Sequence, residues 1–284
     1  MSYLGARNAI SFGVSQHLTL GGPKLLYKLS PSLLLQFAGA ETLDSRVTFT
    51  RTTTATRTNS SGVIESVAIN GPRFDYNPTT LAPNGLLIEE QRTNLLLNSL
   101  IDGTSLSTQI VATTAVSTTL SFYGTGQIVL SGSSSATVVG TGAYPSRKTL
   151  TFTPTVGSLT LTVTGTVQYA QLETGAFATS YIPTAASQVT RTADVATMTG
   201  TNFSSWYNAT EGTLYVEAAG SVNATAQVRV VSLNQASASF RIDTSLNATS
   251  GSSLFMVVNA GVTQAQTIGV SIASGIFYKF SSSY

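Results

Sequence analysis

The sequence predicts an all-β protein: two small antiparallel β-sandwich domains of jelly-roll type, preceded by an extended N-terminal arm and a charged β junction. Three observations lead to this prediction. Only 9% of the 284 residues are charged, against about 25% in an average globular domain, so the usual material of exposed helices is scarce. Threonine, serine, glycine and valine dominate instead, and β-branched side chains fit a pleated sheet. Short segments that alternate apolar and polar residues recur between Gly-Ser turns.

Residues 1–40 form the predicted N-terminal arm, because the segment has scattered glycines and no strong hydrophobic periodicity. Terminal segments of this kind rarely fold alone. Two interpretations stand side by side: the arm docks on another protein of a larger assembly, or it packs in extended form on its own subunit. His17, the only histidine of the chain, lies in this arm without an acidic residue close by in sequence, so a structural role is favoured over a catalytic one.

Residues 41–93 form the predicted charged junction. The segment 41–98 holds eleven of the 26 charged residues of the chain, five arginines and six acids. Turn signals at 77–78 and 82–85 precede a run, 86–88, that is typical of a buried strand. Folding back at these turns brings the charged groups after the strand within reach of those before the turn. The sequence therefore predicts a structural ion-paired corner made of Arg73, Asp75, Glu89, Glu90 and Arg92.

Residues 94–183 are predicted to form the first sandwich. Five short segments in this range alternate apolar and polar residues: 119–123, 127–130, 136–139, 150–153 and 159–163. A period of two with Gly-Ser turns between the segments is typical of a small antiparallel sandwich. The chain has no cysteine, so its stability has to come from packing and association and not from disulfides.

Residues 184–200, which are small and polar around Arg191 and Asp194, are predicted to be a linker. The start of a second sandwich is predicted for residues 201–284, with strands at 212–217, 226–233, 240–243, 254–259 and 276–280. Trp206 is expected to anchor this domain. A complete jelly roll needs further strands, so we expect that the natural chain continues beyond Tyr284 or that another chain completes the domain.

Three segments carry a resemblance to a known family: RVTFTRTTTATRTNSSG (46–62), PRFDYNP (72–78) and GLLIEEQRTNLLLNS (85–99). They resemble a segment of tailed-bacteriophage virion appendages, described as a phage head spike fibre domain and also found in tail fibres. The resemblance implies a virion structural protein on the tail or capsid surface, made in the cytoplasm of the host bacterium. It implies that residues 1–40 dock on a capsid or tail protein and that subunits form a homo-oligomer, with a trimer expected. It brings no catalytic residues with it.

Two further resemblances concern the sandwiches. NLLLNS (94–99) and VQYAQLETGAFATSYIP (167–183) are similar to the first and last strands of galactose-binding-like carbohydrate-binding modules. The strand rhythm of residues 201–284 resembles the opening of a concanavalin A-like, laminin-G-like jelly roll. The resembling phage proteins also show a step like TRTAD (190–194) between these parts. A host-surface glycan is the partner that these resemblances imply, bound by many weak contacts multiplied over several copies per particle.

Glycan binding requires exposed aromatic rings, because the C–H faces of a sugar stack on rings while polar side chains bond its hydroxyls. The candidate carbohydrate-binding residues are Tyr144, Arg147, Tyr123, Trp206 and Tyr207. Tyr144 is the first choice, because it lies beside Pro145 and Arg147-Lys148 in an expected loop at the end of the sandwich, where function concentrates. The alternative for each ring is a place in the core or in a subunit interface.

Enzymatic activity is not predicted. A single histidine and the lack of a GxSxG segment disfavour a Ser-His-Asp triad. Adjacent Glu89 and Glu90 face opposite sides of a strand, so they cannot flank one glycosidic bond. No cofactor and no thiolate or histidine-rich metal site is expected, because cysteine is absent and there is one histidine.

Nucleic-acid binding and membrane insertion are not predicted either. The net charge is only +2, and the arginines are interleaved with acids. No segment approaches the ~18 consecutive apolar residues of a membrane span. The favoured function is a virion tail fibre or related spike that attaches through its N-terminal end and displays β-sandwiches for glycan adhesion. A capsid decoration or head spike protein without receptor binding is the first alternative, and a polysaccharide depolymerase, an activity of some phage fibres, is the second.

Overall fold

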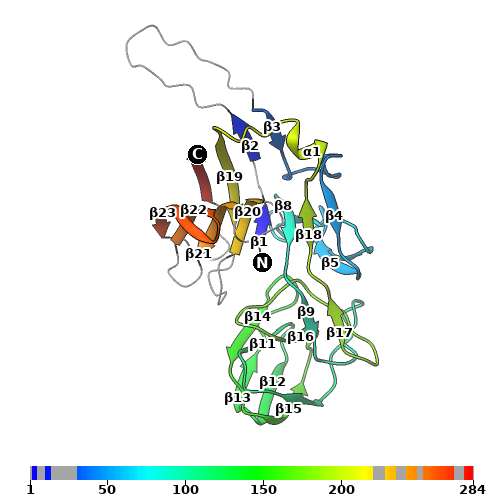
Figure 1. The fold of residues 1–284 in the computed structure, drawn as a ribbon. Helices are drawn as coiled ribbons and strands as arrows, with labels where there is room; N and C mark the ends of the chain where they lie inside the picture. Colours follow the sequence, from blue (N-terminus) through cyan, green and yellow to red (C-terminus); the bar gives the residue numbers. More distant parts are fainter. Residues whose placement is uncertain are drawn as a thin grey trace.

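The computed structural model describes residues 2–4, 10–13, 31–219, 228–234, 241–247, 252–271 and 278–283. In these residues every regular element is a β-strand except α1 (Thr201–Ser204), which confirms the all-β prediction. Figure 1 shows a sandwich at one end of the molecule, a larger group of sheets at the other end, and short paired strands between them. With four residues α1 cannot cross a membrane, and the described chain has no longer helix that could.

The sandwich at the lower end of Figure 1 consists of two antiparallel sheets. The first has the order β10 (Gln109–Thr113), β15 (Gly157–Thr164), β12 (Gln127–Gly132) and β13 (Ala136–Val139). The second has the order β14 (Lys148–Phe152), β11 (Thr118–Tyr123) and β16 (Gln168–Thr174). The five alternating segments of the sequence are the strands β11 to β15.

The alternation of these strands builds the core of the sandwich. On β15, Leu159 and Leu161 are completely buried between the sheets, whereas Ser158 faces solvent. Each fully buried leucine of this kind contributes about 1.5–3 kcal/mol. β11 differs, because all six of its residues are buried. Its outer face is covered by the segment after β16, to which Thr119 Oγ1 donates a hydrogen bond at the carbonyl of Gly175 (2.7 Å).

A seven-stranded antiparallel sheet forms the main part of the other end of the molecule. Its order is β3 (Leu33–Leu35), β2 (Ile10–Gly13), β19 (Thr213–Ala219), β1 (Ser2–Leu4), β8 (Pro83–Ile88) and β7 (Phe74–Tyr76), and β24 (Tyr278–Ser283) also pairs with β19. The sheet thus combines strands from the predicted arm, the predicted junction and the predicted second sandwich. β1 and β2 pair with strands of their own chain. Residues 14–30 of the arm lie outside the described residues.

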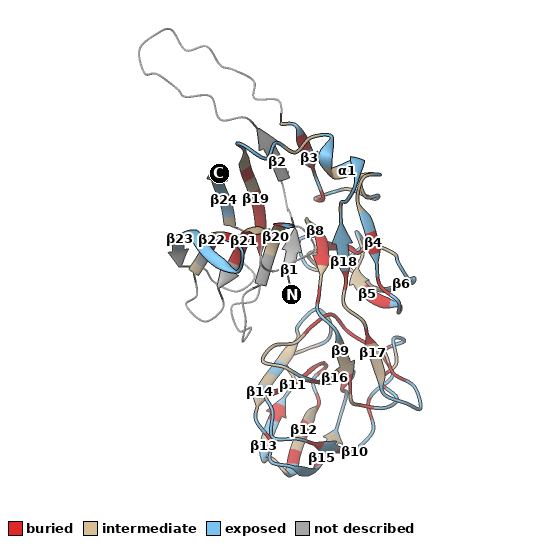
Figure 2. Ribbon diagram, in the orientation of Figure 1, coloured by how far each residue is buried: buried red, intermediate tan, exposed pale blue. Residues whose placement is uncertain are grey.

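A four-stranded antiparallel sheet lies next to β19. Its order is β20 (Val228–Asn234), β21 (Arg241–Asn247), β22 (Ser252–Asn259) and β23 (Val262–Ser271). Leu233 of β20 joins a second hydrophobic core with Phe74, Leu86, Leu214 and Val216 of the seven-stranded sheet. Buried residues, red in Figure 2, mark the central strands β8 and β19 of this core.

Three two-stranded ladders lie outside the larger sheets, two beside the larger end and one next to the sandwich (Figure 1). They are β4 (Thr48–Thr50) with β18 (Val195–Thr197), β5 (Ala55–Thr58) with β6 (Ile64–Val67), and β9 (Arg92–Asn94) with β17 (Val189–Arg191). The segment 184–200, predicted to be a linker, therefore contains two strands that pair with strands before the sandwich. Their partners lie far away in the sequence, so local composition does not reveal them.

Candidate functional site

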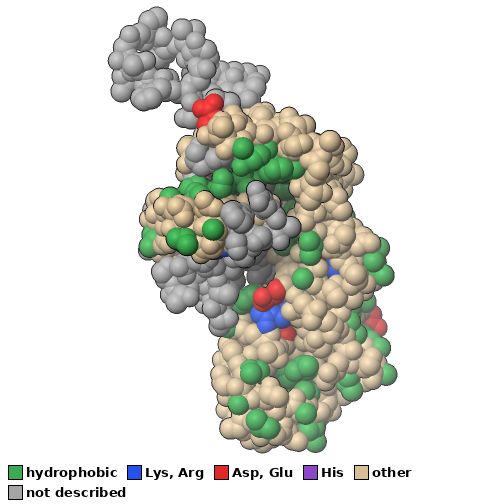
Figure 3. Space-filling view, in the orientation of Figure 1, with side chains coloured by type: hydrophobic (Ala, Val, Ile, Leu, Met, Phe, Trp, Pro, Cys, Tyr) green, Lys and Arg blue, Asp and Glu red, His purple; other side chains and the backbone are tan. Residues whose placement is uncertain are grey.

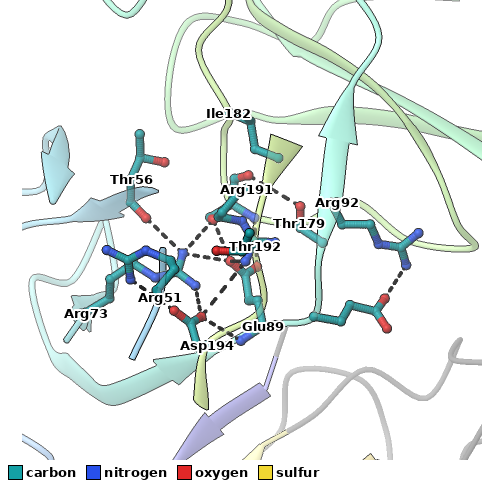
Figure 4. A network of polar contacts seen from close by, with 12 residues as sticks. Arg51, Thr56, Arg73, Glu89, Arg92, Thr179, Ile182, Arg191, Thr192 and Asp194 are labelled. Carbon is teal, nitrogen blue, oxygen red and sulfur yellow. Dashed lines mark hydrogen bonds and ion pairs between the residues drawn. The ribbon is translucent and has the colours of Figure 1, made fainter. Parts of the chain in front are cut away.

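Charge is sparse on the surface and concentrated inside the junction. Figure 3 shows a face of the molecule on which only a few acidic and basic side chains are visible. Five charged side chains lie instead within the junction, each with at most 1% of its surface exposed. They are Arg51, Arg73, Glu89, Arg191 and Asp194, called here the arginine network (Figure 4).

Short strands bring these five residues together from distant segments. Arg51 follows β4, Arg73 precedes β7, and Glu89 follows β8 directly. Arg191 ends β17 and Asp194 precedes β18. Because β17 pairs with β9 and β18 pairs with β4, the second segment is carried back onto the first, and Arg51 contacts Asp194 across 143 positions of sequence.

Asp194 is the centre of the arginine network, because it contacts all three arginines. Its Oδ1 accepts a hydrogen bond from Arg51 Nη1 at 3.0 Å. Its Oδ2 forms an ion pair with Arg73 Nη2 and lies 3.9 Å from Arg191 Nη1. The same oxygen accepts the backbone N–H of Glu89 at 2.9 Å, so it also fixes the end of β8.

Glu89 forms the second centre of the network. Its Oε2 pairs with Arg73 Nη1 at 2.7 Å and lies 3.4 Å from Arg191 Nη1. Ser180, from the segment after the sandwich, donates its backbone N–H to Oε1 at 2.8 Å and its hydroxyl to Oε2 at 2.5 Å. Through these bonds the network holds the segment that leaves the sandwich.

Arg51 also ties the network to neighbouring backbone. Its Nε donates to the carbonyl of Thr53 at 2.9 Å, and its Nη1 and Nη2 donate to the carbonyls of Gly71 at 3.0 Å and Ala68 at 2.7 Å. Arg73 Nη1 donates to the carbonyl of Thr56 at 3.1 Å. The two guanidiniums therefore fix the loop around residues 67–71 and the beginning of β5.

Electrostatics explain why Glu89 is ionised inside the protein. Burial would raise the pKa of its carboxyl group, but the charges of Arg191 and Arg73 and the hydrogen bond from Ser180 outweigh burial and hold that pKa far below its ordinary value. Burial also lowers the pKa of Arg51, against the opposing effect of Asp194. The network as a whole holds three cations and two anions, and its carboxylates are engaged by fixed protein donors.

The predicted ion-paired corner is divided over three places in the structure. Arg73 and Glu89 meet in the network. Asp75 is buried beside it, where it accepts the backbone N–H of Thr58 at 2.8 Å and Nδ2 of Asn84 at 3.2 Å. Glu90 and Arg92 form a separate ion pair, with 57% of the Glu90 side chain and 11% of the Arg92 side chain exposed. Glu89 and Glu90 both follow the end of β8, but the side chain of Glu89 is buried and that of Glu90 is exposed.

The ion-paired corner predicted from the sequence did not include three members of the network, Arg51, Arg191 and Asp194. A signal was present for two of them: Arg191 and Asp194 are the only charged residues between Glu173 and Glu211. An isolated arginine and acid three positions apart in an otherwise neutral segment mark an ion pair, and their partners follow only from the strand pairing.

Three of the candidate carbohydrate-binding residues, Tyr123, Tyr144 and Arg147, lie together in one group. The ring of Tyr144 contacts those of Tyr123 and Tyr169, with centroids 5.2 and 6.5 Å apart. The guanidinium of Arg147 lies over the ring of Tyr123 at 5.9 Å, and its Nη1 donates to the carbonyl of Thr179 at 2.7 Å. Tyr123 is only 8% exposed, whereas Tyr144 and Tyr169 are half-buried.

The other two candidates, Trp206 and Tyr207, lie just after α1 and pack on the second core. Phe203 contacts both rings, at 5.0 Å from Trp206 and 4.7 Å from Tyr207. The indole N–H of Trp206 donates to the carbonyl of Asn202 at 2.9 Å. Trp206 therefore packs on a core that the predicted arm, the junction and residues 201–284 share, and the five candidates form two separate groups.

Within the described residues, no three histidine, cysteine or acidic side chains gather in a way that could hold a metal ion. The fold is a multi-sheet β protein, and the buried ion pairs of the arginine network join segments on both sides of the sandwich. No protein-family model, curated protein or solved structure matches the chain.

Proposed function

We propose that the chain is a structural protein of a bacteriophage particle, a tail fibre or related spike. It attaches to the particle through its N-terminal end and displays its β-sandwiches for adhesion to host-surface glycans. The observation that carries the proposal is the arginine network. Arg51, Arg73 and Glu89 come from the segments that resemble virion appendages, and Arg191 and Asp194 come from the TRTAD step that the resembling proteins share.

The contacts of these residues support a mechanical role for the resembling segments. Their charged groups are buried against one another and against backbone carbonyls. Buried ion pairs add little net stability compared with apolar packing, but breaking one is costly, so they favour a single arrangement of the segments that they join. An appendage needs such a junction, because the domain that meets the host has to keep its orientation to the domain that holds the particle.

Adhesion would use several weak sites at once. The half-buried rings of Tyr144 and Tyr169 are the members of the tyrosine group that reach solvent, and they provide the apolar face on which a sugar ring can stack. One such contact is weak, but a homo-oligomer presents several copies. Once one copy has bound, the high effective concentration of the others raises the overall affinity for the glycan surface. A trimer is the proposed assembly.

Localisation on intact particles tests this proposal first. Gold-labelled antibody against the full chain should bind at the tail or at a spike, and glycan screening with the purified chain should then return a host polysaccharide. Label spread evenly over the capsid would replace this proposal by a capsid decoration protein. Particles that carry no label would contradict a virion role altogether, and release of reducing ends from the polysaccharide would show a depolymerase.

A further inference from the structure

Arg191 is the member of the arginine network whose hydrogen-bond donors have no acceptor. Its side chain is 1% exposed, and none of Nε, Nη1 and Nη2 makes a hydrogen bond to any described residue. The two carboxylates nearest to Nη1 are Oε2 of Glu89 at 3.4 Å and Oδ2 of Asp194 at 3.9 Å. These contacts are ionic, but they lie beyond the 2.7–3.2 Å of a good N–H···O bond.

A buried guanidinium without acceptors is rare in a folded protein. Arginine cannot lose its proton in proteins, so it cannot become neutral as a buried lysine can. Buried polar groups nearly always have a partner, which is either protein or a bound species. The terminal nitrogens of Arg51 and Arg73 follow this rule, because they donate to backbone carbonyls and carboxylates, although Nε of Arg73 has no acceptor. Arg191 departs from it inside the same network.

The charge of the network points to the kind of partner that Arg191 takes. Three guanidiniums face two carboxylates, so one positive charge is unbalanced in a site without access to solvent. Other charged groups of the junction are engaged elsewhere: Arg57 pairs with Glu65, and Arg92 pairs with Glu90. The buried carboxylate of Asp75 accepts hydrogen bonds from the backbone N–H of Thr58 and from Nδ2 of Asn84. A single negative charge at Arg191 would neutralise the network, whereas a water molecule would satisfy N–H groups and leave the charge.

We propose that the arginine network binds one small monovalent anion of the halide class, chloride in the first place, on the guanidinium of Arg191. A dianion such as sulfate would turn the excess of one positive charge into an excess of one negative charge. A buried site also favours anions that lose their hydration easily, because burial of an ion requires its desolvation. Chloride and bromide meet this condition, and strongly hydrated fluoride does not. The inference does not depend on the proposed role in a virion.

Thermal unfolding of the full chain in mixed sodium salts tests the proposal. Chloride replaces fluoride at constant ionic strength, so general screening stays the same. An anion that binds only the folded state raises the midpoint temperature by about 3 °C for each tenfold increase in chloride above its dissociation constant. Equal midpoints in chloride and fluoride would overturn the proposal.

Two variants assign the effect to Arg191. Arg191→Met leaves two cations and two anions in the network, so its midpoint should be the same in both salts. Arg57→Met is the matched control, because Arg57 is an arginine of the same junction with 26% of its side chain exposed. It should keep the chloride dependence. A midpoint of Arg191→Met that still rises with chloride would overturn the assignment.

Crystals of the wild-type chain grown in bromide provide a test that needs no variant. An anomalous peak within hydrogen-bond distance of the Arg191 guanidinium is the expected result. No peak at this guanidinium, or a peak without any chloride dependence of unfolding in solution, would show water or an adventitious ion only and would overturn the proposal. If Arg191→Met does not fold, this measurement and the salt series on the wild type decide the question.

Discussion

The substitution Asp194→Asn tests whether the arginine network stabilises the junction. The change keeps the shape of the side chain but replaces one carboxylate oxygen by an N–H₂ group, which cannot accept a hydrogen bond. Asp194 uses both oxygens, Oδ1 for Arg51 at 3.0 Å and Oδ2 for Arg73 and the backbone N–H of Glu89. The amide therefore places N–H₂ against a donor whichever way it turns, and the network keeps three cations with one anion.

The expected loss of stability is large. Removing one partner of a buried ion pair costs about 3–5 kcal/mol, a sizeable part of the roughly 5–15 kcal/mol that stabilises a typical protein. Urea unfolding followed by the fluorescence of Trp206, the only tryptophan, provides the assay. With a slope near 3 kcal/mol per molar urea, the midpoint should fall by roughly 1 M or more.

The matched control is Asp44→Asn. Asp44 also pairs with an arginine, Arg46, at 2.7 Å, but 28% and 33% of the two side chains are exposed. The control should lose less than about 1 kcal/mol, because water replaces the lost contact. Equal small losses in both variants would refute the reasoning that burial makes the network important for the junction.

Three further predictions concern pH, backbone and the tyrosine group. The lowered pKa of Glu89 stabilises the folded state at pH values above the ordinary pKa of 4.5. This stabilisation is lost as the pH falls below 4.5 toward the pKa of Glu89 in the folded state. Thermal midpoints measured in acid should therefore fall more steeply for the wild type than for Glu89→Gln. Gly175→Ala should destabilise the chain by about 1–3 kcal/mol in urea unfolding, because the φ of Gly175 is +138°, a conformation that side chains other than glycine rarely adopt. The loss should be nearly the same in an Arg92→Ala background, because the guanidinium that the added Cβ meets is the end of a flexible side chain; a loss that disappears in that background would contradict backbone strain as the cause. Tyr144→Phe removes the 3.1 Å hydrogen bond between the hydroxyl of Tyr144 and Thr58 Oγ1, and it should cost about 0.5–1.5 kcal/mol in urea unfolding. It should leave the binding of the protein to a glycan column unchanged. Tyr144→Ala should abolish this binding, because it removes the ring on which the sugar stacks.

The strands of the first sandwich could be predicted from the sequence because their signal is local. Alternation at 127–130 and 159–163 recurs as β12 and β15, with every second residue in the core. The same holds for the scarcity of helix, which follows from composition. β23 was not among the predicted strands, since Val262–Ser271 is polar and its described residues 262–269 are all exposed. Strand formation there follows from pairing with β22 and not from a buried face.

Composition and local pattern predict the all-β class, the strands of the first sandwich and the concentration of charge between residues 41 and 98. Which of these charges meet depends on long-range strand pairing. Arg73 and Glu89 were predictable because one turn joins their strands, but Arg51, Arg191 and Asp194 reach them through the ladders β4–β18 and β9–β17. Residues that far apart in sequence carry no local sign of their partner, because the pairing energy of two short strands depends on everything that folds between them.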